Sequence, residues 1–169
     1  GRSNVGKSSL INALTAHGGL ARVSDTPGRT QEINFFELGG RLMLADLPGY
    51  GYAAAPKEKV AAWTDLIKLY LKGRPTLRRA LVLIDARHGL KDVDRSILTM
   101  MDDSAVNYQI ILTKADKMKP GPLIVCRDQV AEELKKHVAA HPDILVTSSF
   151  TDDGIAEVRA ALSELARPE

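Results

Sequence analysis

The sequence opens with Gly1-Arg2-Ser3-Asn4-Val5-Gly6-Lys7-Ser8, which fits the phosphate-binding pattern G-x-x-x-x-G-K-[ST] at every fixed position. Glycines allow the backbone to wrap closely around phosphates, so that successive N–H groups point inward. Lys7 is expected to bring a positive charge to the β- and γ-phosphates, and Ser8 to ligate Mg²⁺ through its hydroxyl. The helical pattern that follows adds the partial positive charge of a helix N-terminus. This stretch predicts a P-loop nucleotide site, but it does not distinguish ATP from GTP.

A second motif, Asp46-Leu47-Pro48-Gly49, ends an apolar strand and fits D-x-x-G. Its carboxylate is predicted to hold Mg²⁺ through a water molecule, and the Gly49 N–H to meet the γ-phosphate. Thr30 lies in the loop before the strands and is the natural second hydroxyl ligand for the metal. Taken alone, a loop threonine is weak evidence, because most are inert.

A third motif, Thr113-Lys114-Ala115-Asp116, follows another apolar strand and fits [NT]-K-x-D. The Asp116 carboxylate can accept two hydrogen bonds from guanine, one from its ring N–H and one from its exocyclic amine. Adenine lacks that pair of donors, and the mismatch costs a few kcal/mol, roughly two powers of ten in affinity. The Lys114 stem is expected to lie over the base. Thr147-Ser148-Ser149 either brings a backbone N–H to the guanine carbonyl oxygen or caps the next helix.

The chain of 169 residues has the size of one α/β domain, and predicted helices and strands alternate along it. The fold class expected is a P-loop GTPase (Ras-like) three-layer sandwich, with a mostly parallel sheet and one antiparallel hairpin strand. Because a P-loop joins a strand to a helix, we expect residues 1–169 to form a single GTP-binding domain that is truncated at its N-terminus and lacks its first central strand. Predicted helices span residues 7–17, 57–72, 92–103, 122–141 and 154–166. Predicted strands span residues 32–38, 41–47, 80–85, 108–113 and 144–147, and residues 20–31 are expected to form a loop.

Composition narrows the function classes. The net charge is only +2, no apolar run approaches the ~20 residues of a membrane span, and Cys126 is the single cysteine. We therefore expect a cytoplasmic protein without an internal disulfide. Basic residues nevertheless gather in the middle of the chain, where they form either a phosphate-facing patch or a solvated helix surface. They are Lys57, Lys59, Lys68, Lys72, Arg74, Arg78, Arg79, Arg87, Lys91 and Arg95.

Several longer stretches carry a family resemblance. They are GRSNVGKSS at residues 1–9, TPGRTQ at 26–31 with INFF at 33–36, DLPGYGY at 46–52, DARHG at 85–89 and TKADK at 113–117. In these stretches the sequence resembles the YihA/EngB ribosome-biogenesis GTPases of the TrmE–Era–EngA–YihA–septin class. The resemblance covers essentially the whole chain. It implies that Thr30 is the Mg²⁺ ligand of the first switch.

The same resemblance implies a role in maturing the large ribosomal subunit, and it favours ribosomal RNA as the partner of the basic segment. An effect on cell division and septation would follow from that role. We expect a monomer, with no membrane and no DNA partner. The cofactors expected are GTP or GDP, Mg²⁺ and, as a further hypothesis, K⁺.

The residues predicted to bind nucleotide come from these motifs together with the segment around Thr30. They are Gly1, Arg2, Ser3, Asn4, Val5, Gly6, Lys7, Ser8, Ser9, Gly28, Arg29, Thr30, Gln31, Asp46, Leu47, Pro48, Gly49, Thr113, Lys114, Ala115, Asp116, Thr147, Ser148 and Ser149. The metal ligands predicted are Ser8, Thr30 and, through water, Asp46. The catalytic residues predicted are Lys7, Thr30, Gly49 and Asn4, the last as a K⁺ ligand.

Hydrolysis needs an oriented water molecule and compensation for charge on the γ-phosphate. Many GTPases place a glutamine directly after D-x-x-G, whereas Tyr50 stands there in this sequence. We therefore predict slow intrinsic turnover, raised when a partner orders the switches at about residues 22–34 and 47–60. Asn4 either coordinates a K⁺ that substitutes for an arginine finger or simply tolerates the tight turn. Arg29 either acts as a finger in cis or contacts solvent or RNA.

Two functions of different class fit these observations. The first is a GTP-hydrolysing switch in ribosome assembly, and the second is a nucleotide-gated RNA- or protein-binding module with incidental hydrolysis. The cytosolic domain of a membrane GTPase, such as an iron transporter, is disfavoured by TPGRTQ and DLPGYGY. An ATPase is disfavoured by Asp116.

Overall fold

The computed structural model describes residues 1–2, 5–16, 20–24, 34–38, 42–47, 49–50, 57–72 and 75–166. Its helices are α1 Lys7–Ala16, α2 Lys57–Lys72, α3 Asp92–Asp103, α4 Pro120–Leu134 and α5 Ile155–Leu165, with a short 3₁₀ turn at Ala115–Lys117. Its strands are β1 Leu20–Ser24, β2 Asn34–Leu38, β3 Leu42–Asp46, β4 Ala80–Asp85, β5 Tyr108–Thr113 and β6 Leu145–Val146. None of the helices within these ranges is long and apolar enough to cross a membrane.

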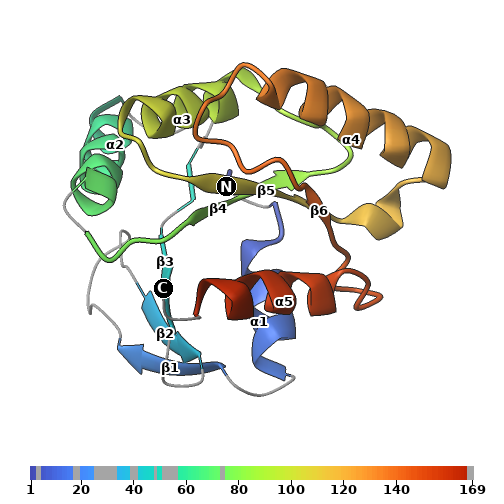
Figure 1. Cartoon of the computed structure of the whole chain (residues 1–169), viewed down its shortest axis with the longest axis horizontal. Coiled ribbons are helices and arrows are strands. Elements are labelled where there is room, and N and C mark those ends of the chain that lie inside the picture. The colour runs from blue at the N-terminus through green and yellow to red at the C-terminus, as the bar shows by residue number, and fades with distance from the viewer. Residues whose placement is uncertain are drawn as a thin grey trace.

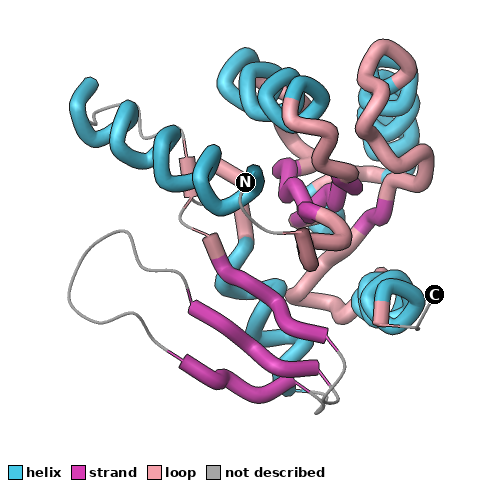
Figure 2. The backbone as a smooth tube through the Cα atoms, turned by 60° about the vertical axis from the view of Figure 1, so that its left-hand side comes forward, coloured by secondary structure: helices cyan, strands magenta, loops and turns pink. Residues whose placement is uncertain are grey.

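The strands form two sheets of different type. Strands β1, β2 and β3 form an antiparallel meander, and β4, β5 and β6 form a parallel sheet in that order. Helices α2, α3 and α4 lie on one side of the parallel sheet, and α1 and α5 lie on the other (Figure 1). Figure 2 shows the antiparallel sheet standing apart from the parallel one. The three-layer α/β class predicted from the sequence is confirmed around the parallel sheet.

Alternate residues of β4 and β5 supply the two cores. Val82, Ile84, Ile110 and Leu112 pack with buried residues of α2, α3 and α4. Leu83 and Ile111 face the other way and pack with buried residues of α1 and α5. Because successive side chains of a strand point to opposite faces, a strand buried on both faces needs a continuous apolar run. That requirement explains why both strands could be located in the sequence to the residue.

Four predicted elements have the bounds that the structure shows: α2, α3, β4 and β5. The loop expected over residues 20–31 is wrong for residues 20–24, which form β1 and pair with β2. The sequence of that strand has no clear apolar alternation, so it is extended because its backbone pairs with β2. The fourth helix ends at Leu134 rather than at residue 141, because the chain turns to pair with β5 through the His141 N–H and the Tyr108 carbonyl (2.7 Å).

The described strands form two sheets, one antiparallel and one parallel. A cavity of about 730 Å³ lies beside β3 and β4, lined by Leu42 and Leu44, by Leu81, and by Leu162 and Leu165 of α5. Strands β3 and β4 are each at the edge of their sheet, so no strand of the described residues joins them. The first central strand expected in front of the P-loop remains a prediction.

Candidate functional site

The P-loop leads directly into α1. Val5 is buried in the core, and Gly6 has φ +99°, a backbone conformation that side chains rarely adopt. The Gly6 carbonyl accepts the first helical hydrogen bond, from the Leu10 N–H (2.9 Å). Ser8 and Ser9 are exposed in the first turn of the helix. The turn therefore presents the helix N-terminus and two hydroxyl groups to solvent, as a phosphate site requires.

The P-loop lysine meets the D-x-x-G motif. Lys7 Nζ lies 2.9 Å from Asp46 Oδ1 and donates a hydrogen bond to the Leu47 carbonyl (2.5 Å). The backbone adds a second link, because Arg2 and Tyr50 form a parallel bridge in which the Tyr50 N–H donates to the Gly1 carbonyl (3.1 Å). Two motifs about 40 residues apart in sequence thus share one site.

Asp46 provides a direct test of whether a metal ion fits. Its Oδ1 atom is buried and has the Lys7 ammonium as its ion-pair partner, but it accepts no hydrogen bond from the described residues. A buried carboxylate oxygen that accepts no hydrogen bond, held beside the residue that precedes Ser8, is the kind of hard oxygen donor that Mg²⁺ prefers. The described residues contain no cluster of three or more His, Cys, Asp or Glu, so a metal here would depend on hydroxyl and phosphate oxygens as well.

Tyr50 occupies the position after D-x-x-G and is only 5% exposed. Its hydroxyl donates to Asp94 Oδ1 (2.6 Å), and Asp94 Oδ2 accepts from the Lys91 N–H at the start of α3 (2.9 Å). Burial, together with the negative charge and hydrogen bond of Asp94, raises the pKa of Tyr50 far above its ordinary value. The ring is therefore held in the core against α3, and it fixes the end of the D-x-x-G segment rather than contacting a water molecule.

The base motif and the last loop lie together. Asp116 Oδ1 accepts a hydrogen bond from the Ser148 hydroxyl (2.7 Å), and the Ala115 N–H donates to the Thr147 carbonyl (3.0 Å). Thr147 is buried, and its hydroxyl donates to the Leu112 carbonyl (3.0 Å), which ties the loop to β5. Ser149 is half-buried beside them, and Asp116 is exposed. The structure thus brings residues 113–116 and 147–149 together, with the Asp116 side chain exposed.

Thr113 connects this base site to the phosphate site. Its hydroxyl donates to the Val5 carbonyl and also reaches the Ile84 carbonyl (3.3 Å). Lys114 has φ +58°, and its Cε would lie 3.8 Å from a Cβ on Gly6. The lysine stem therefore passes over the P-loop glycine, and a side chain on Gly6 would meet it as well as strain the backbone.

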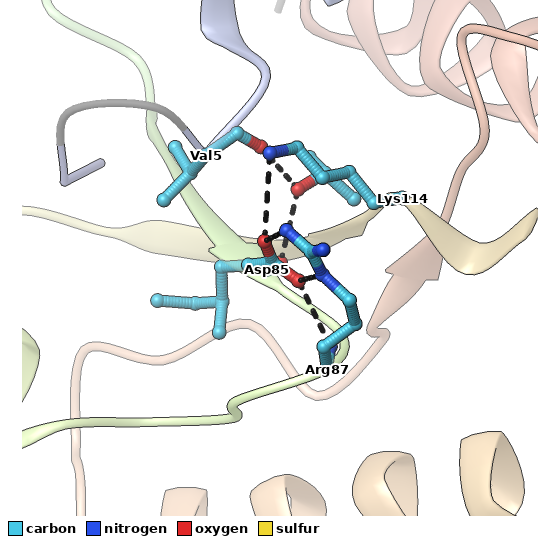
Figure 3. Close-up of polar contacts among 6 residues, drawn as sticks. Val5, Asp85, Arg87 and Lys114 are labelled. Carbon is cyan, nitrogen blue, oxygen red and sulfur yellow. Dashed lines mark hydrogen bonds and ion pairs between the residues drawn. The ribbon is translucent and has the colours of Figure 1, made fainter. Parts of the chain in front are cut away.

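Asp85 is a residue of this site that the sequence motifs did not assign to it. It ends β4, is 5% exposed, and accepts hydrogen bonds from the Arg87 N–H (2.9 Å), Nε (3.1 Å) and Nη2 (2.8 Å) (Figure 3). Lys114 Nζ lies 3.6 Å from Asp85 Oδ2. Burial acts to raise the pKa of Asp85, but the hydrogen bonds from Arg87 and the nearby Lys114 charge outweigh it and leave the pKa below its ordinary value. The available signal was its place, since Asp85, like Asp46, ends an apolar strand.

Seven predicted site residues lie outside the described part of the chain. They are Ser3, Asn4, Gly28, Arg29, Thr30, Gln31 and Pro48. The remaining predicted residues form two neighbouring groups, one at the P-loop with residues 46, 47 and 49, and one at residues 113–116 with 147–149. The two groups join through Thr113 and Val5.

Comparison with known proteins places this arrangement. The family described as "50S ribosome-binding GTPase" matches residues 1–114. The chain is 60% identical over 167 residues to a probable GTP-binding protein EngB of Rhodopseudomonas palustris (strain BisB18), covering 98% of this chain and 77% of that protein. It is 57% identical over 173 residues to the protein of the same name in Rhodospirillum rubrum, covering 99% and 75%.

Solved structures of other proteins are similar to this chain in fold. A crystal structure of a probable GTP-binding protein engB matches with a TM-score of 0.70 and 20% identity, covering 98% of this chain and 95% of that one. The cytosolic domain of the T. maritima FeoB iron transporter in its apo form matches with a TM-score of 0.56 and 26% identity, covering 100% and 62%. The first of these likenesses extends over nearly the whole of both chains.

Proposed function

Because the chain belongs to the family of 50S ribosome-binding GTPases, we propose that it is a GTP-hydrolysing switch that acts in assembly of the large ribosomal subunit. The observation that carries this proposal is the contact between Asp116 and Ser148 beside the P-loop. It supports the proposal because a guanine base could donate two hydrogen bonds to this carboxylate while its phosphates reach residues 5–9. An adenine base would leave that carboxylate unsatisfied.

Ser8 and Asp46 are the described residues that would hold Mg²⁺, together with Thr30 of the first switch. When bound, the ion would neutralise charge on the β- and γ-phosphates. Lys7 would give up part of its contact with Asp46 to reach these phosphates. The exchange is chemically reasonable because the Asp46 carboxylate and the phosphates both offer anionic oxygens to Lys7.

Slow intrinsic turnover follows from the place of Tyr50. Its hydroxyl is engaged by Asp94 in the core, so it cannot orient an attacking water molecule as a glutamine does. Compensation for charge on the γ-phosphate must then come from elsewhere. We propose that K⁺ held by Asn4 supplies it, with Arg29 as the alternative.

The basic residues of the middle segment do not all remain available for RNA. Arg79 donates to Asn107 and Gln109, and Arg95 pairs with Asp92 and Glu133. Lys68 and Lys72 are exposed on α2, and we propose that they contribute phosphate contacts to ribosomal RNA. An effect on cell division and septation would then be indirect, through the supply of ribosomes in the cytoplasm.

The test is binding to isolated large ribosomal subunits and their precursors, in GTP-analogue and GDP states, across a salt series. We expect nucleotide-dependent binding that weakens steeply with salt, and faster single-turnover hydrolysis when precursors are added. Asp116→Asn is the control for nucleotide specificity, and Lys68→Glu with Lys72→Glu should reduce the salt slope. Binding that depends on GTP but leaves hydrolysis unchanged would favour the nucleotide-gated binding module instead.

A further inference from the structure

Lys114 and Asp116 carry opposite charges two residues apart in one exposed loop, and guanine recognition requires the carboxylate to accept from the base. The structure draws the lysine ammonium toward the end of β4, where Asp85 Oδ2 lies 3.6 Å away. Asp116 instead accepts from the Ser148 hydroxyl, a neutral donor that a base could share or displace. The ion pair with Asp85 therefore affects whether the Asp116 carboxylate is available to the base.

We propose that Asp85 is a positioning residue for nucleotide specificity, which holds the Lys114 ammonium and so leaves the Asp116 carboxylate to the guanine base. This inference rests on the guanine site described above, and it adds a residue from outside the P-loop, D-x-x-G and [NT]-K-x-D motifs. Asp85 acts through Lys114 and need not touch the nucleotide.

Strand pairing sets the geometry. Asp85 and Thr113 are partners in the parallel register of β4 and β5, and the Ala86 N–H donates to the Thr113 carbonyl (2.9 Å). Lys114 then turns in the left-handed region, which sends its side chain back across the end of β4 and over Gly6. The loop thus delivers the ammonium to Asp85 without a distortion of either strand.

Arg87 keeps the carboxylate oriented. Its three donors approach Asp85 from the following turn, two on Oδ1 and one on Oδ2, and the buried carboxylate therefore has little freedom to rotate. The arginine also interacts with the charge of Asp116. The four charged side chains alternate in sign across the site, which is the arrangement that lowers the energy of all of them.

Loss of the Asp85 charge would remove the buried anion that Lys114 and Arg87 share. Asp116 lies two positions further along the same loop, and the flexible ammonium of Lys114 would compete with the base for its carboxylate. The predicted result is a site that still binds phosphates through the P-loop but discriminates less well between guanine and other bases. A structural role for Asp85 alone predicts lower stability with unchanged base preference.

The experiment measures the affinities of the full chain for GDP and for inosine diphosphate, which lacks the exocyclic amine and so offers Asp116 one donor fewer. The variants are Asp85→Asn, Lys114→Met, and the two together. Asp102→Asn is the matched control, because Asp102 also accepts from a backbone N–H, that of Ala139, and lies beside a basic side chain, that of His137, in the segment after α4. Thermal unfolding is recorded for each variant.

We expect Asp85→Asn to weaken GDP binding about tenfold and to narrow the preference for GDP over inosine diphosphate. Adding Lys114→Met should restore the preference, since the competing ammonium is then gone, and Asp102→Asn should leave both affinities unchanged. An unaltered preference in Asp85→Asn, or no recovery in the double variant, would overturn the proposal. If every variant including the wild type binds GDP and inosine diphosphate equally, the guanine site itself is wrong.

Should Asp85→Asn not fold, Asp85→Asn with Arg87→Gln gives the same comparison without an unpaired guanidinium. A folded double variant with the wild-type base preference would again overturn the proposal.

Discussion

Replacing Tyr50 by phenylalanine tests the buried hydrogen bond that anchors the D-x-x-G segment to α3. The hydroxyl donates to a carboxylate that is only 1% exposed, and removal leaves Asp94 with the Lys91 N–H as its remaining donor among those described here. Hydrogen bonds to charged groups contribute about 1.5–3 kcal/mol, so we expect a loss of about 2 kcal/mol in the free energy of unfolding. For a chain of this size, that corresponds to a fall in Tm of about 4–8 °C.

The chain contains a matched control for this substitution. Tyr108 is fully buried as well, but its hydroxyl has no hydrogen-bond partner among the described residues. Tyr108→Phe removes the same atom from a comparable environment, and should be neutral or stabilising by up to about 1 kcal/mol. Urea unfolding at pH 7 measures both, provided that the m-values agree with wild type.

Equal losses for the two variants would refute the reasoning, because the hydrogen bond to Asp94 would then contribute nothing beyond ring packing. The assay also checks the role assigned to Tyr50 in hydrolysis. Single-turnover GTP hydrolysis by Tyr50→Phe, measured below its unfolding transition, should stay close to wild type. Abolished hydrolysis with intact nucleotide binding would show that the hydroxyl takes part in the reaction.

Three further predictions follow from particular residues. Gly154→Ala should destabilise the protein by about 3 kcal/mol or more in urea unfolding, because a Cβ at φ +76° would lie 2.0 Å from the Val146 carbonyl oxygen. Gly121→Ala is the control and should be tolerated, because a Cβ there would have no neighbour within 4 Å. The pKa of Asp85 is lowered in the folded protein, so the stabilisation from its charge is present above about pH 4 and is lost as the pH falls through the folded-state pKa. The free energy of unfolding should therefore fall less steeply with decreasing pH in Asp85→Asn than in wild type. The same dependence on acid pH in both proteins would contradict the pairing with Arg87. Turnover should be faster in KCl than in NaCl, and Asn4→Ala should remove that difference; indifference of the wild type to the cation would exclude a K⁺ role.

Much of the parallel half of the fold could be predicted from local sequence. The runs at residues 80–85 and 108–113 are mostly apolar because both faces of β4 and β5 are covered, and short runs of this kind are typical of strands in a parallel sheet. The helices at residues 57–72 and 92–103 likewise carry their own period and breakers. The phosphate and base motifs could be located because each depends on residue types at fixed short spacings.

The antiparallel half was less accessible. Strand β1 contains both polar and apolar residues, and residues 25–33 separate it in sequence from its pairing partner β2. Whether the strands form one sheet or two depends on which strand edges pair with each other, and no local sequence pattern predicts that pairing. For the same reason α4 was predicted too long, since its end is set by the pairing of residues 140 and 141 with β5.

The sequence by itself therefore determined the residue types of the candidate nucleotide site, with Lys7, Asp46 and Asp116, because each has a fixed place within a short motif. Only the tertiary structure decided which partners they meet. Asp85 reaches Lys114 across 29 positions and Tyr50 reaches Asp94 across 44, and both contacts exist because neighbouring strands and a packed helix bring distant residues within hydrogen-bonding or ion-pair distance.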